Sequence, residues 1–281
     1  MRKIEQQVLN YLNYCEKVRR MSPTTMRMKR NVLNRFVAIT KIKDLHNLTN
    51  EIFDAWVADL VRQGVATRSI NTYNTIIMAM IRYYLDIGVN IPLRLSLMGK
   101  LRESAVRRKF YTHAEIEKAL CCADYETRLM IKIMFETGMR ISELTYLKIS
   151  NFHGRRIRFI GKGHKPREVY IRHDTLNQVN EFLYRKKPAM IEATGYLFAT
   201  LNGEPPTVAT IRKRLQKPFL QAGLEGFYPH ALRHSFATNL QLKGASVAEI
   251  KEMMGHESIA TTERYLHGFE GKLEELFSKY G

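Results

Sequence analysis

Cysteine, acidic residues and long apolar runs are all scarce in this chain of 281 residues. Its three cysteines, Cys15, Cys121 and Cys122, show no metal-ligand spacing and no even set for disulfides, so we expect packing residues in a reducing cytoplasm. No apolar run reaches the roughly 18 residues that a membrane-spanning helix needs. The N-terminal stretch has the period of an amphipathic helix and lacks a signal-peptide cleavage pattern. These shortages argue against a disulfide-rich secreted fold and against a membrane partner.

The shortage of acid leaves a large excess of positive charge. The chain has 45 Lys and Arg against 27 Asp and Glu, a formal net charge of +18. Residues 1–109 hold 20 of the basic and 8 of the acidic residues, and no acid lies between Glu16 and Asp44. A run of charge is usually only a solvated face, but this one shares a helix with an apolar stripe. It therefore predicts a one-sided basic surface that binds the backbone of a nucleic acid.

Helical patterns dominate the first part of the chain. Residues 2–18 carry an apolar stripe at helical spacing. Ser22 before Pro23 is typical of a helix N-cap with proline at the first helical position, and Thr49 is typical of another N-cap. A fourth segment, residues 67–88, is polar at its start and apolar later. Residues 1–98 are therefore predicted to form a compact four-helix domain.

The pattern changes after residue 98. Residues 99–111 have no periodicity and are rich in Lys and Arg, which predicts a basic linker between domains. Residues 112–281 are mostly helical, with one helix broken at Gly138. Within them, residues 155–171 alternate apolar and polar side chains around "GKGHK", which predicts a β-hairpin with a glycine-containing turn. The expected fold is mainly α with a small antiparallel β-sheet, and the chain contains no solenoid-like repeat and no low-complexity segment.

Six polar residues of the second domain suit the chemistry of a phosphate. They are Arg140, Lys162, His230, Arg233, His256 and Tyr265. Guanidinium forks grip phosphate oxygens, lysine and histidine can move protons, and tyrosine supplies an oxygen nucleophile. Each residue alone has an ordinary structural explanation, such as a histidine packed in a core. No carboxylate cluster or Cys/His set offers a metal site, so we expect arginines to neutralise the charge, with no metal and no cofactor.

Taken together, the motifs around these residues resemble the tyrosine recombinases, the family of phage integrases and Xer-type site-specific recombinases. "ETGMRISELTYLKISNF" is similar to the first arginine box of that family, with Arg140 at the arginine. "HALRHSFATNLQLKGASVAEIKEMMGHESIATTERYLH" is similar to the second box and contains His230, Arg233, His256 and Tyr265. "FIGKGHKPREVYI" resembles the family's hairpin, with Lys162 at the catalytic lysine. Residues 1–98 resemble, more loosely, the family's four-helix core-binding domain, and residues 112–281 its catalytic domain.

The resemblance implies a reaction. Tyr265 would attack a DNA phosphodiester in line, which gives a 3′-phosphotyrosyl link and a free 5′-hydroxyl. Arg140 and Arg233 would hold the non-bridging oxygens and stabilise the charged transition state. A second strand's hydroxyl would reverse the attack, and two rounds would form and resolve a Holliday junction without ATP or metal.

The remaining roles follow from the same resemblance. Lys162 would protonate the leaving oxygen as general acid, with Lys165 as the one competitor for that role. His230 would assist proton transfer around the tyrosine, and His256 would bond an oxygen of the scissile phosphate. Glu143 is expected to orient other groups of the site and not to act as a catalyst.

Duplex DNA is the expected partner, gripped by the two basic domains as a clamp. Polar faces of the first domain are predicted to contact it through Thr25, Lys29, Arg30, Arg68, Asn71 and Asn74. The tail, with Leu273, Leu276 and Phe277 at helical spacing, either packs on its own domain or docks on a neighbouring protomer. The family resemblance favours docking, in a homo-tetramer or in a hetero-tetramer with a related recombinase.

Two other classes of function remain open from the residues. A type IB topoisomerase-like enzyme would use the same tyrosine chemistry to relax DNA as a monomer; the separate DNA-binding domain and the partner-like tail argue against it. A DNA-binding architectural protein would need no reactive groups, and the full set of six argues against that. Resolution of chromosome dimers and movement of a mobile element are not distinguished.

Overall fold

The computed structural model describes residues 3–103, 109–160, 166–185 and 194–255. The chain divides into two compact units, residues 1–105 and 106–281, each with its own hydrophobic core. The boundary lies inside the segment 99–111 that the sequence predicts as a linker. Among the described helices, none is both long enough and apolar enough to cross a membrane.

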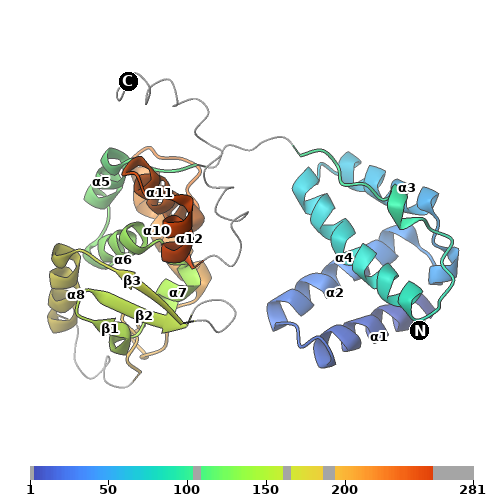
Figure 1. Cartoon of the computed structure of the whole chain (residues 1–281), viewed down its shortest axis with the longest axis horizontal. Helices are drawn as coiled ribbons and strands as arrows, with labels where there is room; N and C mark the ends of the chain where they lie inside the picture. The colour runs from blue at the N-terminus through green and yellow to red at the C-terminus, as the bar shows by residue number, and fades with distance from the viewer. Residues whose placement is uncertain (1–2, 104–108, 161–165, 186–193, 256–281) are drawn as a thin grey trace. The chain divides into compact units, whose positions relative to one another are not determined.

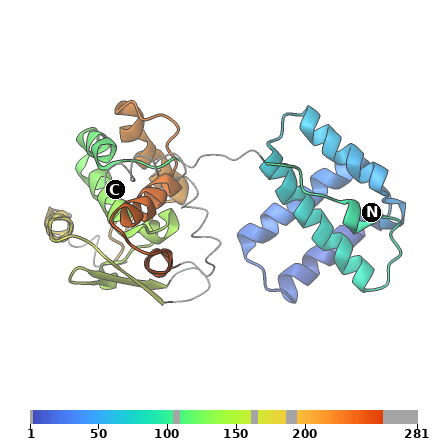
Figure 2. The ribbon, with the colours of Figure 1, turned by 45° about the horizontal axis from the view of Figure 1, so that its top comes forward.

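The first unit is built from four helices, as predicted (Figure 1, Figure 2). They are α1 (Lys3–Lys17), α2 (Pro23–Thr40), α3 (Asn50–Arg62) and α4 (Thr67–Asp86), joined by the short 3-10 turns η1 (Leu45–Asn47) and η2 (Leu95–Leu97). The predicted caps are confirmed: the Ser22 hydroxyl accepts from Thr25 N at 3.3 Å and the Thr49 hydroxyl from Ile52 N at 3.4 Å. Helix α2 packs on α1, α3 and α4, and Trp56 meets Phe36 edge to face in the core.

Part of the segment predicted as a linker packs on this unit. Asn71 of α4 makes two hydrogen bonds to the Leu101 backbone: its Oδ1 accepts from Leu101 N at 2.9 Å and its Nδ2 donates to Leu101 O at 3.0 Å. The same Nδ2 donates to the Glu103 carboxylate at 2.8 Å. At the other end, Tyr111 is fully buried in the second unit, where its N–H donates to Ser235 Oγ. Residues 101–103 and 111 are therefore fixed to their own units.

The second unit surrounds a central helix. After α5 (His113–Cys121), helix α6 (Tyr125–Thr137) has no exposed residue, and it contacts α7 (Ile141–Thr145), α8 (His173–Arg185), α10 (Val208–Gln221) and α11 (Pro229–Leu242). Helix α12 (Val247–Met254) packs on α11 (Figure 1).

A three-stranded antiparallel sheet lies against α6. Its strands are β1 (Phe152–His153), which follows the 3-10 turn η3 (Ile149–Asn151), β2 (Arg156–Ile160) and β3 (Pro166–Tyr170), in the order β1-β2-β3. The register pairs Ile157 with Val169 and Phe159 with Arg167, so the predicted strand pairing is confirmed, while the turn at residues 161–165 lies outside the described residues. Because side chains alternate along a strand, Arg167 lies on the same inward face as Val169.

One prediction about packing is wrong in part. Cys15 is buried in the first core, whereas Cys121 and Cys122 are exposed at the end of α5. A cysteine at a helix end is turned away from a core that lies along the middle of the helix, so residue type alone misjudged both. All three thiols are free.

Candidate active site

A sharp chain reversal presents Arg140. Helix α6 ends at Gly138, whose φ of +60° is a left-handed conformation that favours glycine. A Cβ at this position would also lie 2.3 Å from Cδ1 of Phe236, so α11 approaches too closely for any side chain. Two residues later Arg140 is the N-cap of helix α7, which starts at Ile141. The predicted break in the helix is therefore what turns the Arg140 side chain away from the core, where it remains 23% exposed.

Glu143 holds two arginines with one carboxylate. Its Oε1 accepts from Arg140 Nη1 at 2.7 Å, and its Oε2 accepts from Arg140 N at 2.7 Å and from Arg167 Nη1 at 3.2 Å. The Glu143 and Arg167 side chains are only 8% and 6% exposed. Charge-assisted bonds of this kind are strong and directional in a dry environment. The carboxylate therefore orients Arg140.

Two buried arginines bridge the C-terminal ends of α6 and α12. Arg167 Nη2 donates to Thr137 O at 3.4 Å and to Met253 O at 2.8 Å. Arg233, which is 1% exposed, donates through Nη1 to Gly138 O and through Nη2 to Met254 O. The last carbonyls of a helix carry partial negative charge and lack partners within the helix, so cations stabilise them.

The electrostatics show that the three guanidinium groups form one cluster. The pKa of Arg167 is lowered to about 10, first by burial and then by the positive charge of Arg233; Glu143 opposes this shift and the charge of Arg140 adds to it. Arg167 stays protonated at neutral pH, because even a pKa of about 10 is far above 7. Three cations with one carboxylate give a positive site that an anion would stabilise.

Arg140 also borders a groove on the protein surface. The groove has a volume of about 590 Å³. Its lining is formed by Arg140, Ser142, Glu143, Tyr146, Lys148, Asn151, Phe159 and Ile160. Tyr146 and Ile160 are largely exposed there, and Lys148 Nζ lies 4.9 Å from the ring centre of Tyr196. The groove offers cations and apolar surface together beside the guanidinium cluster.

His230 and Arg233 occupy one helix but different environments. His230, in the first turn of α11, is exposed, whereas Arg233 one turn later is buried. His234 is buried as well and meets Phe110 edge to face, so it is a packing residue. Lys162, Lys165, His256 and Tyr265 lie outside the described residues. Strands β2 and β3 flank the two lysines in sequence, and α12 with its Gly255 cap directly precedes His256.

Arg167 is the member of the cluster that sequence reasoning missed. Nothing in its immediate neighbours distinguishes it from the other arginines of the hairpin. The available signal was the alternation of β3, since Arg167 stands two residues before Val169 and so faces inward with it. A charged residue at an inward position of a strand is a candidate for a buried site. Among the described residues, no group of three or more His, Cys, Asp or Glu could hold a metal ion.

The six residues predicted to touch DNA in the first unit fall into two groups. Arg30 and Arg68 are exposed and Thr25 is half-buried, bonded to the Ser22 cap. Lys29, Asn71 and Asn74 are buried. In this conformation their side chains make hydrogen bonds inside the unit: Lys29 Nζ to Tyr11 Oη at 2.9 Å, and Asn74 Oδ1 from Trp56 Nε1 at 3.2 Å. These bonds argue against direct DNA contacts by the buried three.

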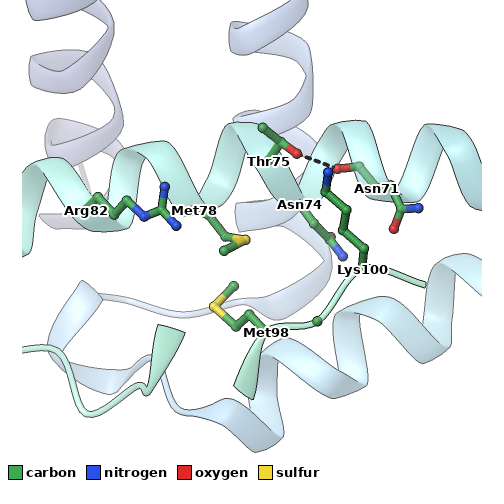
Figure 3. A pocket seen from close by; sticks show the side chains of 8 residues that line it. Asn71, Asn74, Thr75, Met78, Arg82, Met98 and Lys100 are labelled. Atoms are coloured by element: carbon green, nitrogen blue, oxygen red, sulfur yellow. Dashed lines mark hydrogen bonds between the residues drawn. The ribbon is translucent and has the colours of Figure 1, made fainter. Parts of the chain in front are cut away.

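Figure 3 shows where the two asparagines lie. A pocket of about 260 Å³ separates α4 from the segment around Met98, and Asn71 and Asn74 line it. Met78 and Met98 face each other across it, and Arg82 reaches toward it from α4 (Figure 3). Asn71 and Asn74 thus hold this segment and Trp56 in place, which is a structural task.

Two family models and several curated proteins are similar to this chain. The model of the phage integrase family matches residues 107–271, and the model of the phage integrase N-terminal SAM-like domain matches residues 8–85. Tyrosine recombinase XerC of Lactobacillus delbrueckii subsp. bulgaricus is 37% identical over 146 residues, 50% of either chain. Tyrosine recombinase XerD of Staphylococcus aureus is 30% identical over 161 residues, 56% of this chain and 55% of that protein. The chain therefore spans about half the length of the curated relatives it matches.

Solved structures extend the likeness to both units. The XerH site-specific recombinase, bound to a palindromic difH substrate in a post-cleavage complex, is similar with a TM-score of 0.77 and 25% identity, over 94% of this chain and 82% of that chain. A lambda integrase fragment, a dimer bound to a COC' core site, is similar with a TM-score of 0.75 and 17% identity, over 93% and 94% of the two chains. At 17% identity the second match supports a shared fold and nothing more.

Proposed function

The chain belongs to the phage integrase family, and we propose that it is a site-specific recombinase that cleaves and rejoins duplex DNA through a 3′-phosphotyrosyl intermediate. The observation that supports this most is the buried cluster in which Arg140 and Arg233 lie within electrostatic reach of Arg167. A phosphodiester carries one negative charge and gains a second in the pentacoordinate transition state. A preformed positive site stabilises the second state more than the first, and that difference accelerates the reaction.

In the proposed reaction Tyr265 attacks the phosphorus and expels the 5′-oxygen of the next nucleotide. Lys162 protonates that oxygen, His230 assists proton transfer at the tyrosine, and His256 bonds a phosphate oxygen. Arg140 and Arg233 hold the non-bridging oxygens, and Glu143 keeps Arg140 oriented. Attack by the 5′-hydroxyl of another strand reverses the step and exchanges the strands. Neither a metal nor a cofactor has a part in it.

The partners follow from the same proposal. Exposed cations of the first unit, such as Arg30 and Arg68, contact the DNA backbone. Four protomers, identical or paired with a related recombinase, assemble on two sites and resolve a Holliday junction. Their contacts include the tail with Leu273, Leu276 and Phe277. The reaction takes place in the cytoplasm, where the three free thiols stay reduced.

The first experiment tests the nucleophile and finds the DNA site. The full chain is incubated with a pool of randomised duplexes that carry a nick, so that the cleaved fragment diffuses away and the covalent adduct accumulates. Adducts that survive denaturation are recovered and the DNA beside the link is sequenced. We expect adducts with the unaltered chain and none with Tyr265→Phe, which loses one oxygen and should bind the recovered duplex equally well. An adduct with Tyr265→Phe would move the role to another tyrosine, such as Tyr228 or Tyr280.

A second experiment separates the two lysines. Lys162→Ala should cleave the recovered duplex slowly, but a duplex with sulfur in place of the leaving 5′-oxygen should restore most of the rate. A thiolate leaves without protonation, so the general acid becomes dispensable. Lys165→Ala is the matched control, because it removes the same charge from the same turn. Rescue of Lys165→Ala in place of Lys162→Ala would exchange their roles.

A further inference from the structure

Arg167 is buried in the site, yet the proposed reaction gives it no task. Its side chain is 6% exposed, and its guanidinium contacts two neighbouring segments of the chain and a third that is remote in the sequence. These contacts are Glu143 at the start of α7, Thr137 O at the end of α6 and Met253 O at the end of α12, 86 residues away. A residue that serves only to hold the hairpin would need none of these partners. The contacts point to a role that links the segments.

The contact with the end of α12 is also steric. Helix α12 ends at Gly255, which has a φ of +59°. A Cβ at Gly255 would lie 2.7 Å from Cδ and 3.1 Å from Nε of Arg167, so the side chain packs directly against the bare glycine backbone. The position of Arg167 and the position of the chain at Gly255 therefore determine each other.

Arg167 and Arg233 both connect the end of α6 to the end of α12. Arg233 bonds the carbonyls of Gly138 and Met254, and Arg167 bonds those of Thr137 and Met253, the residues just before them. In the proposed reaction Arg233 also donates to a phosphate, so its five N–H groups are shared between the helix ends and the DNA. Arg167 keeps the same two helix ends together while Arg233 serves the phosphate.

We propose that Arg167 is a positioning residue that couples the Arg140 end of the site to the C-terminal end of α12. This inference rests on the proposed function, because the placement matters only if Arg140, Arg233 and the residues after Gly255 act on one phosphate. Displacement of a reacting group by about 1 Å can cost on the order of 100-fold in rate. Removal of the bridge should therefore slow strand cleavage far more than it weakens DNA binding.

Arg128 provides a matched control in the same unit. It also donates to two backbone carbonyls, through Nε to Leu120 O at 3.1 Å and through Nη2 to Ala123 O at 3.3 Å. These hydrogen bonds lie at the junction of α5 and α6 and involve neither Arg140, Glu143 nor Arg233. Arg128→Met thus removes a comparable structural interaction outside the cluster.

The experiment measures the single-turnover rate of adduct formation and the apparent Kd of the full chain on the recovered nicked duplex, at a temperature where every variant is folded. For Arg167→Met we expect the rate to fall on the order of 100-fold and Kd to change by less than about threefold. Arg167→Lys keeps the charge with fewer donors and should recover part of the rate. Arg128→Met should lower the melting temperature and leave the rate unchanged.

A second pair of variants tests the same contact without touching Arg167. Gly255→Ala forces a Cβ against Arg167, whereas Gly244→Ala places one at a φ of +88° with no atom within 4 Å. Both carry the strain of a left-handed alanine, so they should be destabilised alike, and only Gly255→Ala should slow cleavage. If Arg167→Met does not fold, these two glycine variants still test whether the contact between Arg167 and Gly255 controls the cleavage rate.

The outcomes separate the inference from the proposed function. Absence of any adduct with the unaltered chain would overturn the proposed function, and the inference with it. An adduct with the unaltered chain and equal rates for Arg167→Met and Arg128→Met, or for Gly255→Ala and Gly244→Ala, would overturn the inference alone. A loss of rate in Arg167→Met that is fully explained by weaker DNA binding would also overturn it.

Discussion

The two units of this chain carry their positive charge in opposite ways. In the described part of the first unit, Lys29 is the only Lys or Arg that is buried, and its partner is a neutral phenol, that of Tyr11. The second unit buries Arg167 and Arg233 beside Glu143 and the ends of two helices. In the described residues both units have exposed cations, but only the second also encloses two arginines in protein beside a carboxylate.

The difference suggests two separate electrostatic tasks. Exposed cations attract phosphates over several ångströms, are screened by salt and do not depend on a fixed geometry. Buried guanidinium groups are held by directional bonds in a low dielectric, where they act strongly on charge that develops nearby. A recombinase needs both properties, one to bind the duplex and the other to stabilise a transition state. The predictions below test this division.

The largest effect is expected for Arg233→Met. Loss of one donor to a developing negative charge should slow adduct formation by on the order of 100- to 1,000-fold. Binding of the duplex should change little, because the exposed cations are intact. The exposed Arg68→Met is the matched variant and should show the reverse, weaker binding with an unchanged rate at saturating protein. Equal effects of both variants on rate would contradict the division.

A smaller effect, on stability, is expected for Glu143→Gln. The substitution leaves Arg140 and Arg167 without their shared carboxylate, and removal of one partner from a buried ion pair costs about 3–5 kcal/mol in the free energy of unfolding. The only tryptophan of the chain, Trp56, lies in the core of the first unit. Urea unfolding followed by far-UV circular dichroism should therefore shift to lower urea, while the Trp56 fluorescence transition should not.

The control for this variant is Glu181→Gln. Glu181 pairs with Arg185 on α8, where the two side chains are 45% and 64% exposed. Exposed pairs contribute about 0–1 kcal/mol, so neither transition should move appreciably. A shift of the Trp56 transition by Glu143→Gln would mean that the two units do not unfold independently.

The smallest effects are expected for two neighbours on α2, Lys29 and Arg30. Arg30→Ala should lower the salt dependence of DNA affinity by about one unit of slope if it meets a phosphate, with no change in stability. Lys29→Met should leave that slope unchanged, and it should change the free energy of unfolding by less than about 1 kcal/mol because methionine fills the space of a buried lysine stem. A lower slope for Lys29→Met would show that this lysine leaves its pocket to meet DNA.

Most local structure of this chain could be predicted from the sequence. Ser22, Thr49 and Gly138 mark helix ends because their side chains, or the lack of one, satisfy backbone groups within a few residues. The hairpin around "GKGHK" follows from alternation over adjacent residues in the same way. The family motifs are recognisable too, since Arg140 and Arg233 stand in local patterns typical of the family.

Burial of individual polar residues was predictable in part. Lys29 stands three residues after Met26 and four before Leu33, on the apolar stripe of α2, and Arg167 shares a strand face with Val169. The helical spacing of α2 and the alternation of β3 therefore both indicate an inward position for these residues. The prediction that Lys29 contacts DNA followed the charge of the segment, whereas the helical period indicates the buried position that Lys29 has in the structure.

What the sequence by itself determined was therefore whatever depends on near neighbours: helices, caps, the hairpin, the excess of charge and the family motifs. Only the tertiary structure decided which groups those side chains meet. Lys29 bonds the Tyr11 hydroxyl, 18 residues away along the chain. Asn71 bonds the Leu101 backbone, 30 residues away, and Arg167 bonds the Met253 carbonyl, 86 residues away. Periodicity specifies the direction of a side chain relative to its own helix or strand. Its partner depends on how separate elements pack, which no local pattern encodes.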